Sequence, residues 1–283
     1  MTSRRDFAKT LSAAALGYAF RPLAPSPQPL APKRKLDRIG LQLYTVRHEL
    51  EREFEGTIAK VAAAGYQEVE FAGNFGGKAP AEVKAMLDHH GLTAPSAHIQ
   101  SLAPDQWRAS LDAAKAIGHQ YVVVPWIPAE TRKTLDGFKR VAQDFNRVAA
   151  QARDAGLQFA YHNHDFEFAP MEGRLPYDVL LEETDPKLVQ LEIDLYWITK
   201  GGQDPLKYFA RWPGRIPLVH VKDSGGPPDH KMMDVGAGTI DWKKIFARED
   251  QAGIRHAFVE HDQPADAFAS IKASCDYLKR LEF

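Results

Sequence analysis

Four short apolar segments of this chain each end in a side chain of the kind that binds metal ions. They span residues 157–167, 188–194, 216–223 and 255–261, and each is expected to be a buried strand. Asp194, His220 and Glu260 lie at or near the ends of the last three. In a parallel barrel the carboxyl ends of all strands meet on one face, so these side chains can converge although they are far apart in sequence. We therefore predict one divalent-cation site, and with it an enzyme.

The first of these segments offers several candidate ligands. His162 and His164 are two residues apart, and such residues share a face of an extended strand. Glu167 follows in the expected loop. A set that mixes carboxylates with imidazoles suits Mn²⁺, Co²⁺, Zn²⁺ or Fe²⁺ better than a dedicated Ca²⁺ or Mg²⁺ cage. Each residue alone is typical of a helix cap or a core histidine, so the prediction depends on the recurrence in four successive segments.

The N-terminal segment predicts export. Residues 3–9 read SRRDFAK, a twin-arginine signature, and residues 11–20 form a weakly apolar, alanine-rich stretch. A Pro-rich tract over residues 22–32 is typical of an extended tether. We expect residues 1–35 to be a signal peptide and linker, the twin-arginine export machinery to be their partner, and the protein to be periplasmic.

Charge and hydropathy exclude two classes of partner. Residues 1–35 contain seven basic residues and one acidic residue, so the remaining chain has 29 basic and 36 acidic residues and a net charge of −7. Such an acidic domain is poorly suited to binding a nucleic-acid backbone. No run of 18 or more apolar residues is present, so no membrane span is expected. The sequence leaves open whether the chain forms homo-oligomers.

From residue 36 onward, apolar runs alternate with amphipathic stretches, which predicts a single-domain (β/α)8 TIM barrel over residues 36–283. Glycines follow several expected helices, at the position where a left-handed conformation is needed. A doubly wound open sheet would require a Gly-rich loop after the first strand, and residues 42–49 contain none. The expected strands are residues 38–43, 67–71, 93–99, 120–125, 157–164, 188–194, 216–221 and 257–261; the expected helices are 54–64, 80–90, 105–117, 131–155, 176–183, 204–211, 242–251 and 265–281; the glycines are Gly65, Gly91, Gly118, Gly156 and Gly253.

Six motifs in order resemble the xylose-isomerase-like sugar phosphate isomerase/epimerase barrels, a family that includes ketose 3-epimerases, inosose dehydratases and keto-glycoside lyases. The resemblance covers residues 36–281. The motifs are IGLQLY (39–44), GYQEVE (65–70), YHNHDFEF (161–168), EIDLYW (192–197), HVKD (220–223) and VEHD (259–262).

The resemblance implies a divalent ion held by Glu, Asp, His and Glu from strands five to eight. The last three ligands correspond to Asp194, His220 and Glu260. At strand five this chain departs from the pattern, so the ligand is either His162 or Glu167. We favour Glu167, which restores three carboxylates and one histidine. Epimerases of this family share proton transfer between two metal-bound glutamates, so the departure weakens the case for epimerisation.

A metal bound to adjacent carbonyl and hydroxyl oxygens acidifies the neighbouring C–H by stabilising an enediolate. Return of the proton gives isomerisation or epimerisation, whereas loss of a β-substituent gives dehydration or cleavage of a 3-keto-glycoside. We predict a sugar isomerase or epimerase, with the dehydratase or lyase as the alternative. Glu260 is the candidate base, and His162 or His164 the candidate acid. Lys222 shares a face with His220 and is expected to neutralise the enediolate or to pair with a carboxylate.

Several polar and aromatic residues near expected strand ends are candidates for substrate contact. A noncatalytic exported sugar-binding barrel would keep the aromatics without needing the metal-type residues together, and metal-free purified protein would favour it. A metal-dependent endonuclease would need more ligands and a basic groove, which the net charge argues against. The expected carbohydrate-contacting residues are Gln42, Tyr44, Glu70, His98, Trp126 and Trp197.

Overall fold

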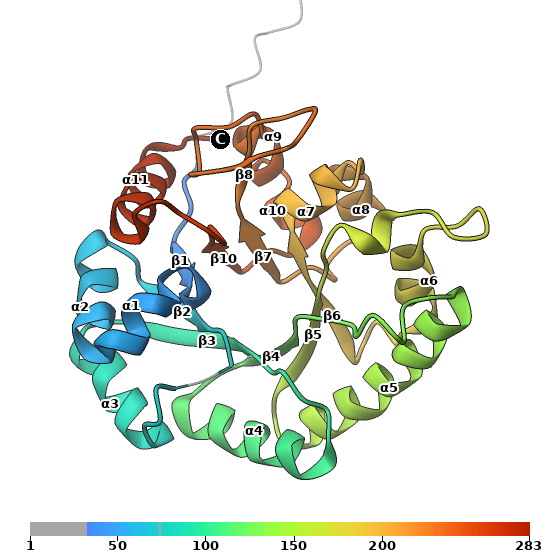
Figure 1. Ribbon diagram of the computed structural model, residues 1–283, viewed down its shortest axis with the longest axis horizontal. Helices are drawn as coiled ribbons and strands as arrows, with labels where there is room; N and C mark the ends of the chain where they lie inside the picture. Colours follow the sequence, from blue (N-terminus) through green and yellow to red (C-terminus); the bar gives the residue numbers. More distant parts are fainter. Residues whose placement is uncertain (1–32, 74) are drawn as a thin grey trace, which may run out of the picture. The chain divides into compact units, whose positions relative to one another are not determined.

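Eight parallel strands close into a barrel in the computed structural model, which describes residues 33–73 and 75–283 (Figure 1). The strands are β1 (Gly40–Gln42), β2 (Glu68–Phe71), β3 (Thr93–His98), β4 (Tyr121–Val124), β5 (Gln158–His162), β6 (Val189–Asp194), β7 (Leu218–Val221) and β10 (His256–Val259). Their order is β1-β10-β7-β6-β5-β4-β3-β2, and every neighbouring pair is parallel. The predicted barrel is confirmed.

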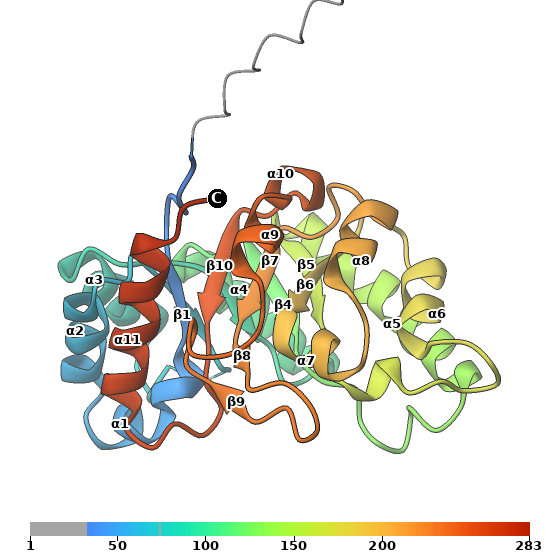
Figure 2. The same cartoon turned by 90° about the horizontal axis from the view of Figure 1, so that it is seen from above.

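Helices surround the barrel (Figures 1 and 2). The helix α5 shows why: Phe138, Ala142, Phe145 and Ala149 recur three or four residues apart and are all buried, so one face packs on the strands. The helices are α1 (Arg47–Arg52), α2 (Phe54–Ala64), α3 (Pro80–His89), α4 (Pro104–Ile117), α5 (Leu135–Asp154), α6 (Pro176–Glu183), α7 (Leu195–Lys200), α8 (Pro205–Arg211), α9 (Trp242–Phe246), α10 (Glu249–Ala252) and α11 (Ala267–Arg280), with the 3₁₀ turns η1 (Leu43–Val46) and η2 (Phe166–Phe168).

Because successive side chains of a strand point to opposite faces, every second residue points into the barrel. Tyr121, Val123, Ala160, Leu218 and Phe258 form a separate apolar cluster inside it. Gly40 makes room for this cluster, because a Cβ at that position would lie 2.4 Å from a ring carbon of Phe258. Residues two positions further along the same strands point to the same interior, toward the carboxyl end. The strands therefore place polar side chains at the carboxyl end of the barrel, next to this apolar cluster.

Some elements differ from the sequence prediction. The expected helix 242–251 is two short helices, α9 and α10. The helix α7 begins directly after β6 without a loop, so no glycine or proline marks the boundary between the two elements in the sequence. All five predicted helix-ending glycines have positive φ, between 67° and 104°.

An additional hairpin lies at the carboxyl end of the barrel. It consists of β8 (Asp223–Ser224) and β9 (Met232–Met233), and Figure 2 shows it at the opposite end from α10. Asp223 fixes the loop that follows: its oxygens accept hydrogen bonds from the backbone of Ile240 (3.1 Å) and Gly236 (2.8 Å), and from the indole of Trp242 (2.8 Å). One buried carboxylate therefore organises the loop beside the site.

The barrel unit begins before the predicted boundary at residue 36. Arg34 and Phe283 exchange two backbone hydrogen bonds, of 2.8 and 3.0 Å, so residues preceding Leu36 are already paired with the C-terminus. The twin-arginine signature and the Pro-rich tract lie outside the described residues. Among the described helices, none combines the length and the apolar character needed to cross a membrane.

Candidate metal centre

Asp194, His220 and Glu260 lie together at the carboxyl ends of β6, β7 and β10. Their potential ligand atoms are all within 4.8 Å of one another, and all three residues are buried. His220 Nδ1 lies 2.8 Å from Glu260 Oε2 and 4.0 Å from Asp194 Oδ2. The structure therefore brings together the three ligands that the sequence proposed.

The two carboxylate oxygens of Asp194 contact different groups. Oδ1 accepts hydrogen bonds from the backbone N–H groups of Tyr196 and Trp197, both 2.9 Å long, and so caps α7. Oδ2 is buried and accepts no hydrogen bond, although Lys222 Nζ lies 3.0 Å away. A buried acceptor left in this state is what a cation would satisfy.

A second group of ligand-type side chains shares His220 with the first. It consists of His98, His162, Glu192 and His220, all buried. Glu192 Oε2 lies 2.8 Å from His98 Nε2 and 2.9 Å from His162 Nδ1, while its Oε1 is buried without a partner. No role was predicted for Glu192 from the sequence. The signal was present, because Glu192 is two residues before Asp194 and must share its inward face.

His220 is held from below by a chain of hydrogen bonds. Its Nε2 lies 2.6 Å from Glu70 Oε2, and Glu70 in turn accepts from Gln42 Nε2 (2.8 Å) and Ser96 Oγ (2.6 Å). This bond leaves Nδ1 facing Asp194 and Glu260, because a carboxylate bound to one ring nitrogen of a histidine orients the other nitrogen toward a metal. Gln42, Glu70 and His98 were expected to line the substrate pocket, and the structure places them beneath the centre, buried.

Lys222 occupies the space between the carboxylates. Its Nζ lies 2.7 Å from Glu260 Oε2 and 3.0 Å from both Asp194 Oδ2 and Asp262 Oδ1. Burial opposes its charge, but Asp194 and Glu260 outweigh that effect and hold the pKa of Lys222 well above its ordinary value. Burial likewise opposes ionisation of Glu260, yet Lys222 and His220 hold the pKa of that carboxyl below its usual range. The predicted pairing of Lys222 with a carboxylate is present in the structure.

At the end of strand five, His162 lies beside the centre, whereas Glu167 is turned away from it. His162 Nε2 lies 3.7 Å from Asp194 Oδ2. Glu167 belongs to neither ligand group, because its oxygens accept hydrogen bonds from the hydroxyl of Tyr161 and from the backbone N–H of His164. Its carboxyl is completely buried, and burial raises its pKa to about 7. The position favoured from the resemblance is thus the more distant of the two candidates.

Aromatic side chains surround His164 above the centre. The ring of His164 lies 4.8 Å from that of Trp126 and 5.6 Å from that of Trp197. Its Nδ1 is buried without a partner, and burial together with Lys222 lowers its pKa to about 3. Trp126 is 45% exposed and Tyr44 41%, so both are accessible from solvent. Contact of these aromatic residues with a sugar stays a prediction.

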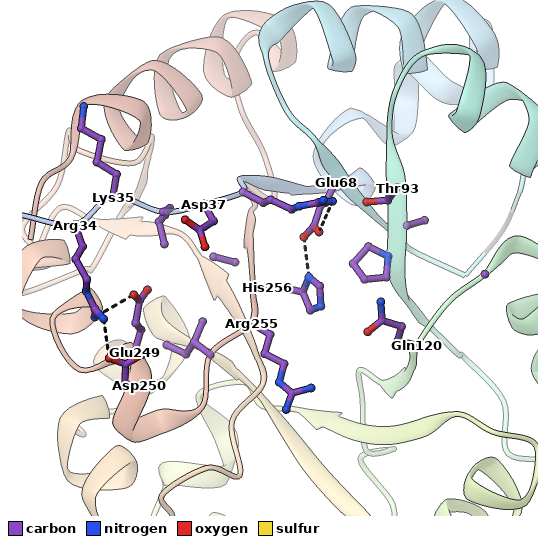
Figure 3. A pocket seen from close by; sticks show the side chains of 17 residues that line it. Arg34, Lys35, Asp37, Glu68, Thr93, Gln120, Glu249, Asp250, Arg255 and His256 are labelled. Carbon is purple, nitrogen blue, oxygen red and sulfur yellow. Dashed lines mark hydrogen bonds and ion pairs between the residues drawn. The ribbon is translucent and has the colours of Figure 1, made fainter.

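A large cavity is at the other end of the barrel. About 830 Å³ in size, it is lined by side chains near the amino ends of the strands (Figure 3). Several of its charged groups are paired: Arg34 with Glu249 and Asp250, and Glu68 with His256. This cavity is therefore separate from the candidate metal centre.

The donor set fits a divalent ion. Asp194, His220 and Glu260 supply two carboxylates and an imidazole, and His162 Nε2 lies 3.7 Å from Asp194 Oδ2. That Oδ2 accepts no hydrogen bond and is paired only with the ammonium of Lys222, whose place between the carboxylates a divalent ion would share. Bound there, a divalent ion would act as a Lewis acid toward a carbonyl or hydroxyl oxygen. The protein's own groups would bind, orient and exchange protons with the substrate.

A closed parallel barrel with a carboxylate and imidazole centre at the carboxyl ends of its strands is an arrangement typical of barrel enzymes. The chain belongs to the xylose isomerase-like TIM barrel family, whose model matches residues 58–281.

Three proteins illustrate what this chain is similar to. An inosose dehydratase of Lacticaseibacillus casei is 28% identical over 244 residues, which are 72% of this chain and 81% of that protein. A crystal structure described as a sugar phosphate isomerase/epimerase, from Parabacteroides distasonis, is 28% identical with a TM-score of 0.75, over 86% of this chain and 98% of that one. A probable 3-DHS dehydratase from Bacillus anthracis, 13% identical with a TM-score of 0.69 over 86% of this chain and 99% of that one, shares the fold.

Proposed function

We propose that this protein is a metal-dependent lyase that eliminates water or an alcohol from a keto sugar. The observation that supports elimination best is the asymmetry of the centre. Glu260 supplies a carboxylate on β10, whereas strand five supplies the imidazoles of His162 and His164. Epimerisation requires matched proton-transfer groups on both faces of the substrate, while elimination requires one base and one different group that protonates the leaving oxygen. The dehydratases among the relatives support the same choice.

In the proposed reaction a C–H bond next to the ketone breaks and its proton passes to the carboxylate of Glu260. The electron pair first forms an enolate, with its negative charge on the ketone oxygen. The ketone then re-forms, and a C=C bond forms as the C–O bond at the next carbon breaks. The leaving oxygen takes a proton from His164, whose Nδ1 has no partner among the described residues; because burial and Lys222 lower the pKa of this imidazole to about 3, it acts as an acid only once negative charge on the bound substrate raises that pKa again. Lys222 lies between Asp194 and Glu260, where its charge would stabilise the oxyanion formed in between. The products are an unsaturated keto sugar and water or an alcohol.

Isomerisation or epimerisation is the second candidate, because the same intermediate can take its proton back on carbon. The solved structures described as sugar phosphate isomerase/epimerase, at 26% and 28% identity, favour it. The two reactions differ in what happens to deuterium and to the leaving group.

The test is metal analysis of purified protein, followed by incubation with an inosose, a 3-keto-glycoside and a ketose in deuterated water. Release of water or an alcohol with formation of a C=C bond supports the lyase. Deuterium on carbon in an intact sugar supports the isomerase or epimerase. Protein that binds sugar, contains no metal and converts none of the three contradicts both proposals and supports a noncatalytic sugar-binding barrel.

We also propose that the chain is exported by the twin-arginine machinery. The motif SRRDFAK at residues 3–9 supports this. Replacement of Arg4 and Arg5 by lysine should retain the protein inside cells that export the wild type, as measured by fractionation. Export of the double variant at wild-type levels would contradict the proposal.

A further inference from the structure

A second cavity, of about 660 Å³, opens at the carboxyl end of the barrel beside the candidate metal centre. Its walls are the hairpin strand β9, the segment after β10 and the first turns of α11. Its volume is in the range of small-molecule sites. The residues that line it are Trp197, Lys231, Met232, Met233, Asp234, His261, Asp262, Gln263, Pro264, Ala265, Asp266, Ala269 and Ser270.

Two contacts connect this cavity to the centre. Asp262 Oδ1 lies 3.0 Å from Lys222 Nζ, which also contacts Asp194 and Glu260. Trp197 donates its backbone N–H to Asp194 Oδ1, and Lys222 Nζ lies 5.6 Å from the centre of its ring. A substrate bound at the metal centre would therefore be one side chain away from the cavity.

The charges of the cavity disfavour an anion. Three carboxylates line it, those of Asp234, Asp262 and Asp266, against one lysine, Lys231. A phosphate placed among these carboxylates would be repelled by like charges. Each carboxylate uses its Oδ1 within the described protein: Asp262 toward Lys222, Asp266 toward the backbone N–H of Ala269, and Asp234 toward the hydroxyl of Ser270.

The same residues suit a neutral, hydroxylated group. The Oδ2 atoms of the three carboxylates accept no hydrogen bond from the described residues, so they can accept from sugar hydroxyls. Trp197, Met232, Met233 and Pro264 provide apolar surface for the C–H faces of a ring. The cavity thus combines hydrogen-bond acceptors with apolar contacts and a net negative charge.

We infer that this cavity binds the uncharged, hydroxyl-rich group that leaves during the reaction, so that the substrate is a neutral keto-glycoside larger than one sugar ring. This inference rests on the proposed function. The processed ring sits at the metal centre, and the glycosidic oxygen joins it to the group in the cavity. When the C–O bond breaks, the leaving oxygen takes a proton and departs as an alcohol, with no oxidant or reductant required.

The test compares substrates with and without a second ring. Ala269 is an exposed residue on the first turn of α11, and Ala269→Trp would fill the cavity without altering the centre. We expect kcat/KM for a keto-disaccharide, divided by that for the methyl keto-glycoside, to fall about tenfold or more. Ala81→Trp, at an exposed position of α3, is the matched control and should leave this ratio unchanged.

A substrate with a phosphate on the second ring tests whether the cavity disfavours negative charge. The phosphorylated keto-disaccharide should react about tenfold more slowly than the neutral one, because the carboxylates repel it. Preference for the phosphorylated substrate would overturn the inference. An unchanged ratio in Ala269→Trp, in an enzyme that does cleave keto-glycosides, would overturn it while leaving the proposed function intact.

Binding of the unoxidised disaccharide, measured by calorimetry, separates the two proposals, because it requires no turnover. If wild-type protein binds it and Ala269→Trp does not, while no keto sugar is converted, then the proposed function fails and the binding assignment holds. If both proteins bind it equally, the assignment is wrong.

Discussion

The two ends of the barrel contain similar side chains in different states of hydrogen bonding. At the amino end, Glu68 Oε2 lies 2.8 Å from His256 Nδ1 and its Oε1 lies 3.6 Å from Arg38 (Figure 3). At the carboxyl end, Asp194 and Glu192 each keep one buried oxygen without a hydrogen bond. Both ends have buried carboxylates and histidines, and the amino end has the larger cavity. Buried carboxylate oxygens that accept no hydrogen bond, rather than overall burial or cavity size, therefore distinguish the candidate site among the described residues.

Among the variants proposed here, Asp194→Asn should have the largest effect on metal binding and turnover. The side-chain oxygen of asparagine can still cap α7, so its amide group would replace Oδ2 and present a donor where a cation is expected. Turnover should fall by about 10²–10³-fold or more, with loss of bound metal. Metal analysis and steady-state kinetics measure this. Glu68→Gln is the matched control at the amino end and should keep both metal and turnover; equal losses in the two variants would remove the distinction.

Glu167 differs from Asp194 and Glu192, because it is a buried carboxylate whose two oxygens both accept hydrogen bonds. Its pKa of about 7 in the folded protein exceeds the ordinary value of 4.5, so the folded state binds the proton more tightly than the unfolded state does. Stability should therefore fall as pH rises from 4.5 to 7, by about 3 kcal/mol from this group.

Glu167→Gln should remove that pH dependence. In the wild type Glu167 accepts from the hydroxyl of Tyr161 and from the N–H of His164; in the variant the amide oxygen can still accept from that N–H, while the amide NH2 faces the hydroxyl oxygen of Tyr161 and can donate to it. Urea unfolding of both proteins at pH 5 and pH 8 measures the difference. A variant whose stability still declines over this interval as steeply as the wild type would show that another group is responsible.

Metal removal should destabilise the carboxyl end specifically. An ion present at 100 times its dissociation constant stabilises the folded state by about 2.7 kcal/mol. Thermal unfolding with and without a chelator should show this loss in wild-type protein and in Glu68→Gln. Asp194→Asn should show no shift, and a shift of wild-type size in that variant would place the ion elsewhere.

Much of the fold could be predicted because its signals are local. Short apolar runs alternating with amphipathic stretches, separated by glycines such as Gly65 and Gly118, are sufficient for a (β/α)8 barrel. The helix α7 was missed because Asp194 ends a strand and caps a helix at once. The hairpin of β8 and β9 was missed because each strand has two residues, too few for a detectable period.

The centre was predicted in part for the same reason. Asp194, His220 and Glu260 each end a strand, and strand ends are readable from sequence. Choosing between His162 and Glu167 was not possible, because it depends on where Tyr161 and the backbone of His164 lie in space. The role of Glu192 depends on three histidines from three other strands, and only the closed barrel brings these together.

The smallest predicted effect concerns the amino end itself. Glu68 and His256 form a mostly buried pair that the proposed reaction does not use. A double-mutant cycle of Glu68→Gln and His256→Phe should give a coupling energy of about 1–2 kcal/mol in urea unfolding, because the hydrogen bond is lost while the ring contact with Phe258 remains. Turnover should stay at the wild-type level in all three variants. If instead the cycle shows no coupling and turnover falls, the paired amino end takes part in function, and satisfied hydrogen bonding would no longer separate the two ends.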